Sequence, residues 1–167
     1  MFYRTFVAPA FRIPLNLIAA ILVAGCSPLN LASTDIKPFN MVAKNNVLII
    51  RHDAGGVLGV YARNSIEIRN NNINVRFEGN CESACTLYLS LPRDTLCVAP
   101  NATFGFHLPY GRSAKNNQIA AEYLLVKYPA WVRNWIKNQG GLNEDIIVMK
   151  FDFARKHLPL CKLLQQA

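Results

Sequence analysis

Acidic residues are scarce in this chain of 167 residues, which has 10 Asp and Glu side chains against 18 Lys and Arg. Charged residues of both signs make up 17% of the sequence, whereas 51% is hydrophobic. A disordered chain lacks the apolar side chains that build a core, so this composition excludes a wholly disordered protein. The nine Gly and nine Pro follow no period, which excludes a collagen-like repeat. The length is that of one domain.

The sequence also lacks the patterns of nucleic-acid-binding and zinc proteins. It has no run of five like charges and no motif that combines basic and aromatic residues, so no nucleic-acid partner is expected despite a net charge of +8. Cys81 and Cys85 have no nearby Cys/His pair at a zinc-binding spacing. We therefore predict neither a metal nor another cofactor, and we expect the basic charge to face solvent or anionic lipid headgroups.

The N-terminal hydrophobic run, residues 13–24, is too short to span a bilayer, which takes about 20 residues. It follows a basic segment and ends in small residues before Cys26, a pattern typical of a secretory signal. The sequence Val-Ala-Gly-Cys resembles a bacterial lipobox, which implies that residues 1–25 are a lipoprotein signal peptide and that Cys26 is lipidated. An ordinary secretory signal or an uncleaved anchor is the alternative.

The lipobox resemblance implies a protein of the bacterial cell envelope that is anchored to a membrane through its N-terminal lipid and faces the periplasm. In the usual sorting pattern, Ser27 after the lipidated Cys favours the outer membrane. Residues 26–45 are polar and contain Pro, so they are predicted to be a tether, and residues 46–167 are predicted to be the folded domain.

Four further cysteines predict disulfides, because an even number in an oxidising compartment is typical of a disulfide-bonded protein. They are Cys81, Cys85, Cys97 and Cys161. Cys81 and Cys97 flank one short helix and turn, and are therefore the first choice for a pair. Alternatively, Cys85 is a small buried apolar side chain.

Strand and helix patterns alternate along the predicted domain. We expect strands at residues 46–52, 73–77, 96–99, 103–107 and 145–149, and helices at residues 57–68, 83–91, 115–138 and 151–158. Pro129 is expected to kink or restart the longest helix. This alternation predicts a single α/β domain with mainly parallel strands and flanking helices.

Three segments of the domain carry residues suited to acyl transfer. Asp53-Ala54-Gly55-Gly56 lies between a strand and a helix, where exposed backbone amides can hold an anion. Ser83 lies at a strand-to-helix junction, although Ser is also a preferred N-cap there. His107 ends a short strand, and a lone His in this setting is more often structural than catalytic.

The order and spacing of these segments resemble the Clp protease proteolytic subunit and its relatives in the crotonase-like fold. In that family, a Gly-Gly turn follows a strand and the nucleophile lies in a run of small residues. The His comes about two dozen residues later, in a Pro-Asn-x5-His-x-Pro frame that this chain matches at residues 100–109. The resemblance covers roughly residues 46–110. The chain also resembles small exported Clp-like proteins with a Cys-x-Ser-Ala-Cys core.

The resemblance implies a serine hydrolase that cleaves peptides or unfolded proteins and that assembles into a homo-oligomer. Ser83 would be the nucleophile, and His107 would take its proton and later protonate the leaving group. The backbone amides of Gly55, Gly56 and Ala84 would stabilise the negative oxygen of the tetrahedral intermediate.

The third catalytic residue is implied less directly. The Asp of the family lies nearly fifty residues after the His, which favours Asp152, with Asp145 as the alternative. Neither lies in the Arg-Asp motif of the family, so a backbone carbonyl that orients His107, Lys150 in a dyad, or an inactive site are further alternatives. The second functional hypothesis is a non-catalytic Clp-like envelope lipoprotein that serves peptide binding or assembly.

Overall fold

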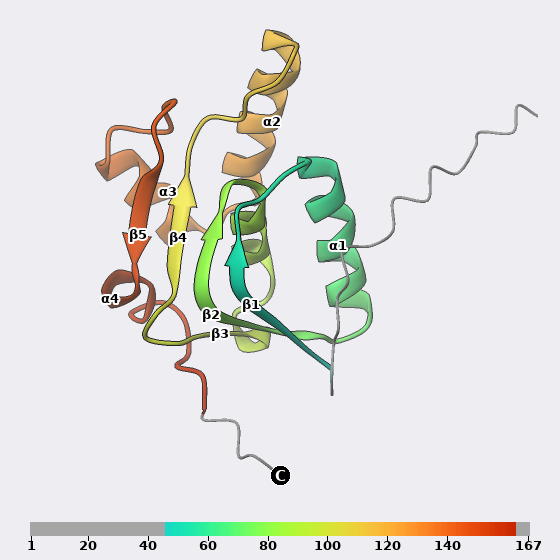
Figure 1. Ribbon diagram of the computed structural model, residues 1–167, viewed down its shortest axis with the longest axis vertical. Coiled ribbons are helices and arrows are strands. Elements are labelled where there is room, and N and C mark those ends of the chain that lie inside the picture. The colour runs from blue at the N-terminus through green and yellow to red at the C-terminus, as the bar shows by residue number, and fades with distance from the viewer. Residues whose placement is uncertain (1–45, 163–167) are drawn as a thin grey trace, which may run out of the picture. The chain divides into compact units, whose positions relative to one another are not determined.

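The computed structural model describes residues 46–162, which form a sheet with several helices (Figure 1). The elements in chain order are β1 (Val47–Asp53), α1 (Leu58–Asn70), β2 (Asn74–Glu82), the 3-10 helices η1 (Ser83–Ser90) and η2 (Arg93–Thr95), β3 (Leu96–Val98), β4 (Thr103–Phe106), α2 (Ala114–Lys127), α3 (Ala130–Asn138), β5 (Ile147–Lys150) and α4 (Phe151–Ala154). This part of the chain is a mixed α/β domain. The predicted signal peptide, the tether and Cys26 lie outside the described residues.

The five strands form one sheet in the order β1-β2-β4-β5, and β3 also pairs with β2. β1, β3 and β4 are parallel to β2, whereas β5 is antiparallel to β4. Figure 1 shows the arrowheads of β1, β2 and β4 at the same edge, with β5 reversed beside them. Because the carboxyl ends of parallel strands meet at one edge, the segments that follow β1, β2 and β4 are brought together there.

Aromatic packing ties the middle of the sheet to the helices. Phe77 of β2 and Phe104 of β4 are fully buried and meet edge to face, with ring centroids 4.9 Å apart. Phe106, at the end of β4, packs against Tyr128 and Trp135 at 5.6 Å from each. The carboxyl end of β4 is therefore held rigidly at the place where His107 follows.

Two of the helices differ from their predicted form. The helix predicted at residues 83–91 is the 3-10 helix η1, and its residues from Ala84 to Leu89 are buried. The long predicted helix is divided at Pro129, as expected, because proline lacks the amide that would continue α2. Within residues 46–162, no helix has both the length and the apolar character that crossing a membrane requires.

All four of the predicted disulfide cysteines form disulfides, but the first-choice pair Cys81–Cys97 is wrong. The bonds join Cys81 to Cys85 and Cys97 to Cys161. Cys97 pairs in register with Arg76 of β2, five residues before Cys81 on the same strand. At about 3.3 Å per residue, Cys81 and Cys97 lie roughly 16 Å apart, far beyond the reach of a disulfide.

Candidate functional site

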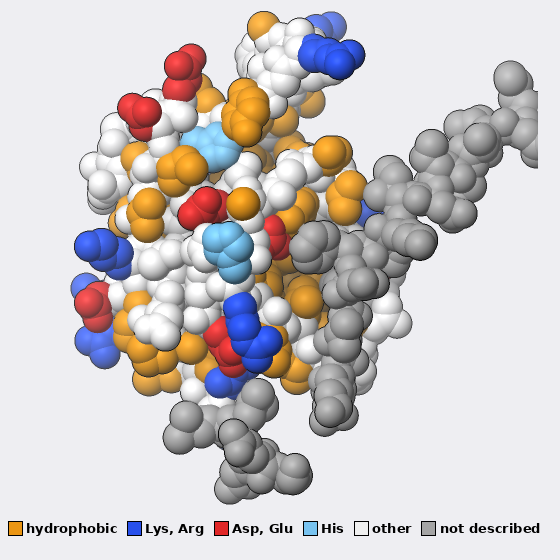
Figure 2. All heavy atoms as spheres, in the orientation of Figure 1, with side chains coloured by type: hydrophobic (Ala, Val, Ile, Leu, Met, Phe, Trp, Pro, Cys, Tyr) orange, Lys and Arg blue, Asp and Glu red, His pale blue; other side chains and the backbone are white. Residues whose placement is uncertain are grey.

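A cavity of about 730 Å³ lies at the edge of the sheet where the parallel strands end. Gly55, Gly56, Ser83, Ala84 and His107 all line it, so the three segments singled out from the sequence share one cavity. The remaining lining residues come from the start of α1, from α2 and from the loop before β5. Figure 2 shows histidine side chains on one face of the domain, with acidic and hydrophobic side chains around them.

Ser83 has an unusual backbone conformation, with a φ of 54° directly after the extended end of β2. Non-glycine residues rarely adopt this left-handed conformation, and they persist there only when their surroundings hold them. One such constraint is Gly55, which packs directly against the turn. A Cβ atom built on Gly55 would lie 2.6 Å from Ser83 Cβ and 2.8 Å from the Ala84 amide nitrogen.

Hydrogen bonds of the buried Thr86 side chain also hold the same turn. The Thr86 hydroxyl donates to the Ser83 carbonyl over 2.6 Å, and it also lies 2.6 Å from the Tyr128 hydroxyl. Because the single hydroxyl proton of Thr86 goes to the carbonyl, Tyr128 is the donor in the second bond. Burial raises the pKa of Tyr128 and keeps this donor protonated.

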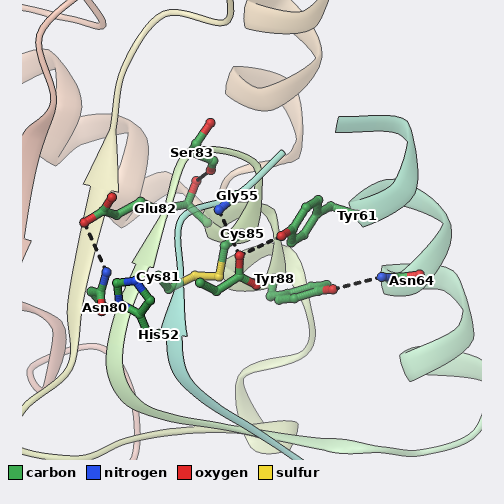
Figure 3. Close-up of a disulfide and its surroundings, with 12 residues drawn as sticks. His52, Gly55, Tyr61, Asn64, Asn80, Cys81, Glu82, Ser83, Cys85 and Tyr88 are labelled. Atoms are coloured by element: carbon green, nitrogen blue, oxygen red, sulfur yellow. Dashed lines mark hydrogen bonds between the residues drawn. A yellow bond between two sulfur atoms is a disulfide. The ribbon is translucent and has the colours of Figure 1, made fainter. Parts of the chain in front are cut away.

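The Cys81–Cys85 disulfide adds a covalent constraint, because it joins the end of β2 to η1 across Ser83 (Figure 3). Both cysteines are fully buried. Ser83 does not occupy the N-cap position of η1, because Glu82 is the N-cap residue and Ser83 is the first residue of the helix. The turn is thus fixed by its neighbours while its hydroxyl stays at the cavity.

The imidazole of His107 is oriented by a backbone carbonyl, one of the alternatives open from the sequence. Its Nδ1 lies 2.7 Å from the Leu108 carbonyl oxygen. A carbonyl can only accept a hydrogen bond, so Nδ1 carries the proton and the neutral ring has a free lone pair on Nε2. This tautomer is the one that a general base needs. No hydrogen bond joins Ser83 and His107 in the described part of the chain.

The Gly-Gly turn is fastened by Asp53, which the sequence did not single out as a separate residue. Its Oδ1 accepts a hydrogen bond of 2.8 Å from the Gly55 amide and one of 2.6 Å from the Tyr61 hydroxyl (Figure 3). Burial, together with this carboxylate, raises the pKa of Tyr61, so the tyrosine stays a donor.

These bonds narrow the set of amides that could face an oxyanion. The Gly55 amide is engaged by Asp53, and Gly55 instead provides the close contact with Ser83. The Gly56 amide has no hydrogen-bond partner among residues 46–162. Ala84 belongs to the first turn of η1, where amides lack partners within the helix. Gly56 and Ala84 are therefore the donors that remain.

Asp152 is separated from His107, which corrects the implied assignment of the third residue. β5 runs antiparallel to β4, so Lys150 pairs with Thr103 and Ile147 pairs with Phe106. Asp152 and Lys150 therefore lie at the opposite end of β4 from His107. The Asp152 side chain is 85% exposed and forms an ion pair of 3.4 Å with Arg155. It is an acidic residue in the first turn of α4.

The loop before β5 instead brings a different carboxylate to the cavity. Glu144 lines it, whereas its neighbour Asp145 does not. The Leu108 amide donates to the Asn143 carbonyl over 2.7 Å, which fastens this loop to the segment that carries His107. Nothing in the local sequence distinguishes Glu144 from Asp145. Predicting which carboxylate reaches the cavity would have required the direction of β5.

Glu82, next to Ser83, faces away from the cavity that Ser83 lines. Its Oε1 accepts a hydrogen bond of 3.3 Å from Asn80, whose own Oδ1 lies 2.6 Å from His52 Nδ1 (Figure 3).

Within residues 46–162, no three His, Cys, Asp or Glu side chains are grouped so that they could hold a metal ion.

Comparisons with known proteins add little to this geometry. No protein-family model matches the chain, and no curated protein matches it. Among solved structures, a point mutant of ClpP1 from Listeria monocytogenes is similar, with 15% sequence identity and a TM-score of 0.42 over 66% of this chain and 68% of that chain. A likeness of this size carries no inference about function.

Proposed function

We propose that residues 46–162 form a Clp-like serine hydrolase domain that cleaves peptides through an acyl-enzyme. One observation carries the proposal. Ser83, in a left-handed turn held by its surroundings, shares a cavity with a histidine whose Nδ1 proton is fixed and whose Nε2 is free. Strained, tightly supported backbone is a feature of nucleophile positions.

The proposed hydrolysis has two stages, formation of the acyl-enzyme and its hydrolysis by water. Ser83 Oγ attacks the scissile carbonyl carbon while His107 Nε2 takes the hydroxyl proton, and the carbonyl oxygen becomes negative between the Gly56 and Ala84 amides. The C–N bond then breaks, and the leaving amine takes the proton from His107. Water repeats the sequence on the ester, which releases the acid and restores Ser83.

The peptide substrate, the cellular setting and the assembly rest on the sequence. The resemblance to Clp proteases and their exported relatives supports a peptide or unfolded-protein substrate and a homo-oligomer. The lipobox-like motif at Cys26 supports an enzyme anchored to a membrane of the bacterial envelope, facing the periplasm. A non-catalytic peptide-binding protein is the second candidate, because a carbonyl rather than a carboxylate holds His107 Nδ1.

A fluorophosphonate probe tests the proposal, because it reacts only with an activated serine. We expect the full-length protein to be labelled, Ser83→Ala to lose labelling, and His107→Ala to lose most of it. Ser83→Gly is the matched variant, since glycine adopts a positive φ without strain and removes only the side chain. Ser90→Ala, at the other end of η1, should keep full labelling. A folded wild-type protein that stays unlabelled near neutral pH would favour the non-catalytic candidate.

A further inference from the structure

A second cavity of about 580 Å³ adjoins the one that contains Ser83. The two cavities share Pro109, Tyr110, Asn117 and Glu144, so they form a continuous groove along the first half of α2. The hydrolytic steps above use none of these four residues. The groove is therefore available for the parts of a substrate that flank the scissile bond.

The charge of this groove is opposite to that of the chain. The full sequence has a net charge of +8, yet no Lys or Arg lines either cavity. Glu144 is the one carboxylate among the lining residues, and it forms no ion pair within the described domain. An anionic group would meet this carboxylate without a compensating cation, whereas a cationic group would find a partner.

Tyr110 provides a second, independent indication that the groove binds a cationic group. Its side chain is 85% exposed, the highest value among the large hydrophobic residues of the described domain, so core packing does not account for it. Its ring centroid lies 5.5 Å from that of His107, which places it near the scissile bond. An aromatic face beside a carboxylate attracts ammonium and guanidinium groups.

We propose that the groove recognises a Lys or Arg side chain of a peptide, within a few residues of the bond to be cleaved. The cation pairs with the Glu144 carboxylate, and the methylene stem lies along the Tyr110 ring, as the apolar stems of such residues commonly do. The position relative to the scissile bond rests on the proposed function, but recognition of the cation does not require cleavage.

Paired fluorogenic peptides test this specificity. Each pair is identical except for Lys or norleucine at one position, scanned over the two residues on either side of the scissile bond. At one position, we expect Lys to raise kcat/KM about two- to fivefold over norleucine, the range that exposed charge pairs provide. Glu144→Gln should abolish the preference, and Glu144→Lys should reverse it, so that the norleucine peptide becomes the better substrate. Glu67→Gln on α1, which lines neither cavity, should leave it unchanged.

Binding to the Ser83→Ala protein separates this inference from the proposed function. Fluorescence anisotropy with the same peptides should show tighter binding of the Lys peptide, again lost in Glu144→Gln and reduced in Tyr110→Ala but not in Tyr110→Phe. If the wild type resists the fluorophosphonate while this preference persists, the groove is a cation site without hydrolase activity. If the protein is labelled at Ser83 but Lys and norleucine peptides are cleaved and bound equally at every position, the cation site is overturned.

Discussion

At the scale of single residues, the contact between Gly55 and Ser83 is the most restrictive in the site. A methyl group at Gly55 would lie 2.6 Å from both Ser83 Cβ and the Glu82 carbonyl oxygen, on a backbone with a φ of 82°. Gly140 has a similar φ of 93°, but a Cβ there would meet nothing within 4 Å. Comparing alanine substitutions at the two glycines therefore separates the destabilisation caused by a steric clash from that caused by backbone strain.

Gly140→Ala should lower the free energy of unfolding by about 1–2 kcal/mol, the usual cost of a left-handed conformation. Gly55→Ala adds overpacking of about 1–3 kcal/mol and displaces the Ser83 turn. We expect it to lose fluorophosphonate labelling as well, whereas Gly140→Ala keeps it. Urea denaturation and labelling rates measure both effects. Equal destabilisation by the two substitutions would contradict the close contact.

Tyr88 gives the domain a dependence on alkaline pH. Burial, its principal cause, raises the pKa of Tyr88 to about 12 from an ordinary value of 10.0. Above pH 10 the unfolded chain therefore releases a proton that the folded chain keeps, so the unfolded state is favoured as the pH rises toward 12. Tyr88→Phe should reduce the loss of unfolding free energy between pH 9 and 11. A wild-type and a Tyr88→Phe protein with identical slopes in urea titrations would refute this.

At the scale of secondary-structure elements, the two disulfides have different roles. Cys81–Cys85 closes a separation of 4 residues around Ser83, whereas Cys97–Cys161 closes a separation of 64 residues and ties β3 to the end of the described chain. In the chain-entropy account, these loops contribute about 2 and about 4 kcal/mol, respectively. Loss of Cys97–Cys161 should therefore lower stability more, whereas loss of Cys81–Cys85 should lower activity more.

Paired alanine variants test this order. Cys97→Ala with Cys161→Ala should cost the larger part of the unfolding free energy and leave labelling of the folded protein nearly intact. Cys81→Ala with Cys85→Ala should cost less stability but slow labelling by about ten- to a hundredfold, since a misplacement of about 1 Å can cost a catalytic group roughly 10²-fold in rate. If both variants lose labelling only in proportion to their unfolded fraction, the Cys81–Cys85 bond has no positioning role.

The elements also explain which parts of the site the sequence could predict. Hydrophobic runs and turn residues were enough to predict that Ser83 follows a strand and that His107 ends one, whereas a site shared by the two residues was implied only by the Clp resemblance. The direction of β5 could not be read from its four residues. A parallel β5 would bring Asp152 to the cavity, whereas the antiparallel strand brings Glu144 there instead. The disulfide pairing failed for a similar reason, because it depends on which part of β2 pairs with β3.

At the scale of the whole molecule, the predicted anchor concerns residues outside the described domain. If Cys26 carries a lipid, the full-length protein expressed in bacteria should incorporate a metabolic palmitate analogue and sediment with membranes. Cys26→Ser should abolish incorporation and release the protein, whereas Ser27→Ala should retain the lipid. Incorporation that survives in Cys26→Ser would show that the lipobox resemblance is misleading.

The left-handed turn at Ser83 also limits which nucleophiles an engineer could place in this protein. Cysteine differs from serine only beyond the β carbon, so a thiol would fit the same backbone and the same contact with Gly55. Threonine is branched at the β carbon, and such residues are genuine outliers at a positive φ. The proposed active site should therefore accept cysteine in place of Ser83 as the nucleophile, but not threonine.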